Sequence, residues 1–151
     1  MIIDGNFTLK DVEIQKVWDT MLKADTLAAV VPGAEKIVAV DNKTYDCVVK
    51  QSVGPISVKL QFQMKLTETR PPNYVKPEGA GEALGKMGTF TVVLEVTMKE
   101  VAPKTIDVTY HTDANIVGKL ATFGERIMRA KAKTIGEEIT KNLQAKLSAA
   151  K

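Results

Sequence analysis

The chain alternates apolar and polar residues over long stretches, a pattern typical of β-strands that bury one face of a sheet and leave the other in water. Between Ile56 and Thr67 the alternation has no exception, with an apolar residue at every even position. Further alternating runs cover 89–98 and 105–116, weaker ones cover 2–10 and 44–53, and a short apolar run covers 37–40. Each of these segments predicts a strand.

Short turns separate neighbouring strands and predict antiparallel hairpins. They lie at Asp41–Lys43, Val53–Pro55 and Ala102–Lys104, where Gly, Pro, Asn and Asp favour turns over helix. Between positions 70 and 88 prolines and glycines blur the pattern. There we predict a strand around 73–80, bent or bulged at Pro77, followed by a flexible loop.

Two segments have helical periodicity instead. Asp11 and Asp25 are suitable N-caps for two short helices, which Pro32-Gly33 must end. The second segment runs from about Val117 to the end of the chain, and its apolar stripe predicts one long helix.

This order of elements predicts an α+β fold in a single domain, residues 1–151. Seven amphipathic strands form a curved antiparallel sheet, and its inward face must be covered. Only the C-terminal helix is long enough to cover it, so we expect the sheet to wrap around that helix, with two short helices after the first strand.

Composition narrows the range of functions. One cysteine and one histidine exclude an internal disulfide and a zinc site built from His and Cys, and we expect no metal and no cofactor. Neither a membrane-spanning run nor a secretory signal is evident, so a cytoplasmic protein is expected. The net charge of +3 does not argue for nucleic acid, although eight basic and three acidic residues follow position 116.

Five short motifs occur in order along the chain: Val17-Trp18, Val31–Glu35, Val53–Pro55, the glycine-spaced hairpin from Gly79 to Gly88, and Gly118–Arg126. Together they resemble the family of the G-type subunit of carbon monoxide dehydrogenase, which belongs to the START-like, helix-grip (SRPBCC) superfamily. The resemblance implies the same fold that the periodicity predicts.

The resemblance also implies a function. Members of that family serve molybdenum-containing hydroxylases of the carbon monoxide dehydrogenase type, help attach them to the cytoplasmic membrane, or pass electrons to quinone. The superfamily commonly holds an apolar molecule between sheet and long helix. Many members carry a hydrophobic C-terminal anchor that this sequence lacks, so we expect at most peripheral membrane contact here.

The alternation predicts which side chains face the helix, and this set lacks the groups that acid–base catalysis needs. Glu95, Asp107, His111 and Asp113 all have the outward parity. Cys47 has the inward parity, where burial would keep its thiol inert.

Two tyrosines and two glycines leave alternatives open. Tyr45 and Tyr110 could fill the core or offer a hydroxyl to a ligand carbonyl. Gly124 and Gly136, both assigned to the long helix, could make room for a flat ligand or allow close packing. Gly79, Gly81 and Gly85 do not form a nucleotide-binding motif and are interpreted as a mobile hairpin or lid.

We therefore expect a non-enzymatic protein that binds a lipid-like molecule or an isoprenoid quinone and serves a molybdenum hydroxylase. The expected lining residues are Tyr45, Val58, Leu60, Phe62, Phe90, Val92, Leu94, Val108, Tyr110, Phe123, Gly124 and Ile127. One alternative is an aromatase- or cyclase-like enzyme that would use Glu82, Lys86 or Arg126. The other is an interaction module with a filled core and no ligand.

Overall fold

The structure, a computed structural model, describes residues 1–149. The strands are β1 Ile2–Lys10, β2 Ala34–Ala39, β3 Thr44–Val53, β4 Ile56–Arg70, β5 Tyr74–Ala83, β6 Gly88–Ala102 and β7 Thr105–Val117. The helices are α1 Ile14–Met21, α2 Ala24–Val30, the short 3-10 helix η1 Lys119–Phe123 and α3 Glu125–Ala149.

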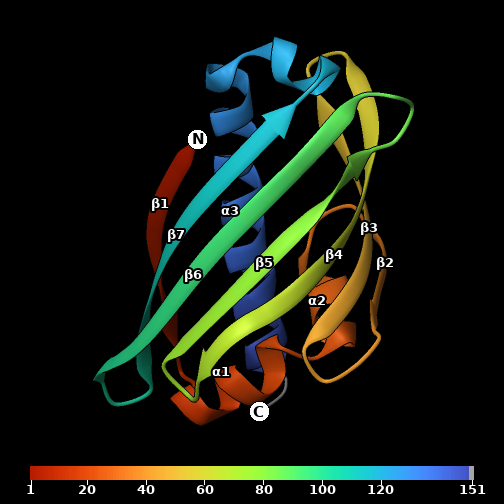
Figure 1. The fold of residues 1–151 in the computed structure, drawn as a ribbon. Coiled ribbons are helices and arrows are strands. Elements are labelled where there is room, and N and C mark those ends of the chain that lie inside the picture. Colours follow the sequence, from red (N-terminus) through yellow and green to blue (C-terminus); the bar gives the residue numbers. More distant parts are fainter. Residues whose placement is uncertain (150–151) are drawn as a thin grey trace.

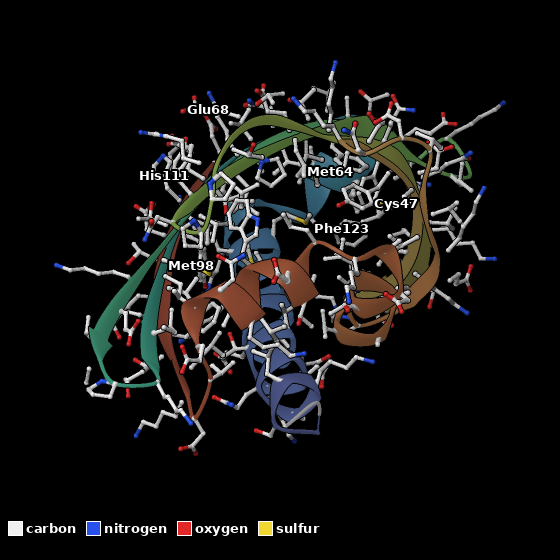
Figure 2. The ribbon with its side chains drawn as sticks, turned by 90° about the horizontal axis from the view of Figure 1, so that it is seen from below. Cys47, Met64, Glu68, Met98, His111 and Phe123 are labelled. Atoms are coloured by element: carbon white, nitrogen blue, oxygen red, sulfur yellow. The ribbon has the colours of Figure 1, made fainter. Side chains whose placement is uncertain are left out.

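All seven strands form one antiparallel sheet in the order β1-β7-β6-β5-β4-β3-β2. The sheet curves around α3, while α1 and α2 cover the end of the concave face near the C-terminus of α3 (Figure 1). This is the predicted architecture. The alternation was also right about direction, since Cys47, Met64, Met98 and Phe123 lie inside the arch and Glu68 and His111 lie outside it (Figure 2).

The strand predicted around 73–80 is longer than expected. β5 continues to Ala83, so Gly79 and Gly81 lie inside the sheet rather than in a flexible loop. The bulge expected at Pro77 is present, because the register between β4 and β5 shifts beside the pair Leu66 and Pro77. The glycine-rich sequence hid the strand because glycine adds no apolar side chain to the alternation.

The N-termini of the two short helices also differ from prediction. Asp11 has φ of 60° and lies before α1, whose N-cap is Glu13. Lys23 is the N-cap of α2, and Asp25 lies in its first turn, where its Oδ1 accepts a hydrogen bond from the Thr26 amide. Neither helix therefore has the predicted side-chain cap.

The predicted C-terminal helix is interrupted. Gly118 (φ 105°) and Gly124 (φ 90°) flank η1, and α3 begins only at Glu125. Their backbone conformations are outside the helical region and are rarely adopted by residues with a side chain. The last two residues assigned to this helix, 150 and 151, lie outside the described residues.

The core consists of three separate clusters of buried residues. The first joins α1 and the C-terminal part of α3 to β1, β6 and β7, and contains Leu9, Val17, Met98, Ile106, Val108, Leu143 and Leu147, among others. The second, under α1 and α2, contains Tyr45, Cys47, Leu66 and Val75. The third, at the η1 end, contains Val53, Val58, Ala83 and Leu120.

Candidate ligand-binding hollow

The middle of the concave face belongs to none of the three buried clusters. Phe90, Val92, Leu94 and Tyr110 point towards α3 but are only partly buried, and none of them packs in a cluster. The closest backbone approaches of α3 are to β1, β3, the short helices and η1 rather than to the central strands. An apolar hollow therefore lies between β4–β7 and the first half of α3.

Two glycines of β5 shape the wall of this hollow. Gly81 pairs with Phe62 on β4 and Phe90 on β6, whose rings meet edge to face at 5.5 Å between centroids. Gly79 is flanked by Met64 and Val92 in the same way. The rings and methionine occupy the space that side chains on β5 would otherwise fill.

Tyr110 closes the hollow on the β1 side. Its ring lies over Gly5, the residue it pairs with on β1, and a Cβ on Gly136 of α3 would lie 3.2 Å from its hydroxyl oxygen. Gly136 therefore permits close packing, as one of the two interpretations held. The Tyr110 hydroxyl makes no hydrogen bond to another described residue, which leaves it available to a polar group of a ligand.

Three of the predicted lining residues lie in the core instead. Tyr45, Val58 and Val108 are fully buried, one in each cluster. The Tyr45 hydroxyl donates a 2.5 Å hydrogen bond to the Leu22 carbonyl, so it anchors α1 to β3 and is not free for a ligand. Leu60, Phe62 and Phe123 are partly buried at the edges of the clusters, where they border the hollow.

Cys47 is buried beside Tyr45, and burial raises the pKa of its thiol from 9.0 to about 11. The unfolded chain releases this proton near pH 9, whereas the folded protein retains it until about pH 11. Stability supplied by the buried neutral thiol is thus fully present below pH 9 and is lost as the pH rises towards 11.

Between pH 8 and pH 10.5 we expect this thiol to remove about 2 kcal/mol from the free energy of unfolding. Urea denaturation of the wild type and of Cys47→Ala at both pH values measures the effect. The alanine variant starts lower because of its cavity but should lose less stability with pH. Equal losses in the two proteins would contradict the assignment.

A cleft of about 230 Å³ opens between the end of β7 and the start of α3. It is lined by Met1, Ala114, Asn115, Ile116, Ala121, Gly124, Glu125 and Met128. A Cβ on Gly124 would meet nothing within 4 Å, so this glycine is required by its φ of 90° rather than by a need for room. Ile127 is 43% exposed on the flank of α3, and Met128 packs beside Phe123 in its place.

The inner face of α3 adds residues that the sequence interpretation did not select. Met128, Ala132 and Ile135 follow one another at helical spacing and are partly buried above the hollow. Thr112 faces it from β7. Helical periodicity counted back from the buried Leu143 could have found the α3 residues, but the apolar stripe was traced through Ile127.

The groups considered for catalysis lie away from the hollow. Glu82 lines a polar depression of about 510 Å³ on the outer face of the sheet, together with Lys36, Asp46 and Gln61. Lys86 and Arg126 are exposed. His111 contacts Asp4 on the outer face, where both side chains are about half exposed.

Comparison with known proteins agrees with this geometry. The CoxG family, named for the G-type subunit of carbon monoxide dehydrogenase, matches residues 5–148. The chain belongs to this family. No curated protein matches the CoxG chain described here.

Solved structures place this CoxG chain in the START-like fold class. A conserved protein from Geobacillus kaustophilus matches with a TM-score of 0.91 at 19% identity, over 99% of this chain and 97% of that one. A START superfamily protein from Mycobacterium smegmatis matches with a TM-score of 0.75 at 7% identity, over 99% of both chains. The Zhui aromatase/cyclase from Streptomyces sp. R1128 matches with a TM-score of 0.73 at 9% identity, over 98% and 93%.

These similarities confirm the predicted fold, and at such low identity they show nothing beyond it. Among residues 1–149, no helix combines the length and apolar character needed to cross a membrane.

Proposed function

We propose that this CoxG-family protein binds a lipid-like molecule or an isoprenoid quinone in the hollow under α3, and does so without catalysing a reaction. The observation that carries the proposal is the set of large apolar side chains, Phe90, Val92 and Leu94, that face α3 yet remain partly exposed. A domain of this size normally buries such residues completely. A ligand would complete their burial.

The size of the hydrophobic term supports useful affinity. Removing about 300 Å² of apolar ligand surface from water contributes roughly 7 kcal/mol before the cost of association, at about 25 cal/mol per Å². The free hydroxyl of Tyr110 and the side chain of Thr112 offer hydrogen bonds to a carbonyl. An apolar molecule with one or two carbonyl groups fits this arrangement.

An aromatase- or cyclase-like activity, the second candidate, is favoured only by the fold it shares with the Zhui enzyme. Such chemistry needs an acid or base within hydrogen-bond reach of the substrate. Glu82, Lys86 and Arg126 all point away from the hollow, and burial holds the Cys47 thiol in its neutral form near pH 7. We therefore favour binding over catalysis.

The proposed partner is a molybdenum hydroxylase of the carbon monoxide dehydrogenase type, in keeping with the name of the family. The η1 end of the molecule is suited to collecting an apolar ligand from a membrane. Leu84, Val117 and Ile127 are exposed there, and Lys86, Lys119 and Arg126 lie in the same segments. Basic residues beside exposed apolar ones favour contact with anionic lipid.

One experiment tests binding and membrane collection together. The protein is mixed with phosphatidylcholine vesicles that contain 30% phosphatidylglycerol and a long-chain isoprenoid quinone, and the vesicles are then removed by sedimentation. Native mass spectrometry of the protein left in solution should detect a 1:1 complex with quinone or phospholipid. Protein that stays empty under these conditions, and also when purified gently from cells, would support the ligand-free interaction module instead.

A further inference from the structure

The C-terminal half of α3 is firmly attached to the rest of the molecule. Leu143 and Leu147 are fully buried in the first cluster. The Gln144 side chain also accepts a 2.9 Å hydrogen bond from the Lys10 amide and donates a 3.1 Å bond to its carbonyl, which caps the free edge of β1. Apolar burial and backbone hydrogen bonds therefore both hold this end in place.

The N-terminal half of α3 is held differently. No residue between Glu125 and Asn142 is fully buried. Near the start of the helix, the Arg129 guanidinium donates a hydrogen bond to the Ile2 carbonyl on the free edge of β1, and Nε and Nη2 donate to Glu125 Oε1 at 2.9 and 2.7 Å. Both side chains are about half exposed. Water competes for exposed ion pairs of this kind, so they open readily.

This polar contact lies beside the cleft at the end of β7. Glu125 itself lines the cleft, together with inward-facing Ala114, Ile116 and Met128, which continue into the hollow. Gly124, with φ of 90° and open space around it, immediately precedes the helix and can change conformation without a clash. The first turns of α3 can therefore swing away from β1 while the buried C-terminal half stays in place.

We propose that Arg129 is a latch over the opening through which an apolar ligand reaches the hollow, and that the ligand passes between β7 and the first turns of α3. Breaking the contact between Arg129 and Ile2 widens the cleft, and remaking it closes α3 over the ligand. The route rests on the proposed binding function, whereas the latch is a property of the protein without ligand and can be tested separately.

Hydrogen exchange of the ligand-free protein tests the latch. Arg129→Ala removes both contacts, and Arg126→Ala is the matched control, because Arg126 is an exposed arginine of the same helix and has no ion pair among residues 1–149. We expect amides of residues 129–135 to exchange about three to ten times faster in Arg129→Ala than in Arg126→Ala. Amides beyond Leu143 should exchange equally in both variants. Equal exchange over 129–135 in the two variants would overturn the latch.

Stopped-flow binding of 1-anilinonaphthalene-8-sulfonate, a fluorescent apolar probe, tests the route. In Arg129→Ala both association and dissociation should be about three to ten times faster, with little change in affinity, while Arg126→Ala and Gln144→Ala keep the wild-type rates. Arg129→Lys retains a donor for the Ile2 carbonyl and should give intermediate rates. Faster exchange without faster probe binding would overturn the route and keep the latch. If the probe binds none of the proteins, the binding function fails, and the exchange experiment still decides the latch.

Discussion

Replacing Ala132 by tryptophan should reduce ligand binding at least a hundredfold. Ala132 lies on the inner face of α3 between Met128 and Ile135, directly above the hollow. An indole there would occupy the space that the ligand is proposed to fill, and would itself complete the burial of Phe90 and Leu94. Because the added ring enters space rather than a packed core, we expect the folded protein to keep or increase its thermal stability.

Ala130→Trp provides the matched control, since Ala130 is exposed on the same helix. Both variants and the wild type are titrated with the fluorescent probe and assayed for quinone uptake from vesicles. The control should bind like the wild type. If Ala132→Trp binds equally well, the ligand does not occupy the hollow, and if it unfolds at a much lower temperature than Ala130→Trp, the space under α3 is already filled.

The alternation of apolar and polar residues was enough to predict the sheet, its hairpins and the side of it on which each side chain lies. His111 and Glu95 were assigned to the outer face on parity alone, and the structure places His111 beside Asp4 and Glu95 beside Tyr74 there. Parity is reliable in this protein because the strands are long and their side chains alternate strictly between the two faces.

Parity cannot predict how deeply an inward side chain is buried. Val58, Val92 and Val108 have the same inward parity, yet only Val92 is left partly exposed. The difference depends on the distance between each strand and α3, which follows from the curvature of the whole sheet. For this reason the sequence predicted the right face for the hollow but included core residues such as Tyr45 among its lining.

Glycines were the second source of error. Gly124 was assigned to the interior of a helix, and Gly79 and Gly81 to a loop, because a missing side chain interrupts any periodic pattern. The structure shows that each has a specific role: a backbone with φ of 90° at Gly124, and close cross-strand packing at the other two. These roles depend on φ and on neighbours distant in the sequence, which local patterns do not report.

Gly81 is the position where an added methyl group should cost most. A Cβ there would lie 2.1 Å from the Gln61 carbonyl oxygen and 2.5 Å from Cβ of Phe62, and the carbonyl belongs to the backbone of β4 and cannot rotate away. Gly81→Ala must therefore push β5 away from β4. We expect the free energy of unfolding to fall by about 3 kcal/mol, which corresponds to a melting temperature roughly 10 °C lower.

Gly79→Ala is the matched comparison two residues earlier on β5. Its Cβ would lie 3.2 Å from the end of the flexible Met64 side chain and from a methyl group of Val92, both of which border the hollow and have space to move. That variant should lose less than about 1 kcal/mol. Urea denaturation and thermal melting of both variants measure the difference. Similar losses at the two positions would mean that Gly81 does not bring β4 and β5 into close contact, and that the Phe62–Phe90 ring pair does not depend on this glycine.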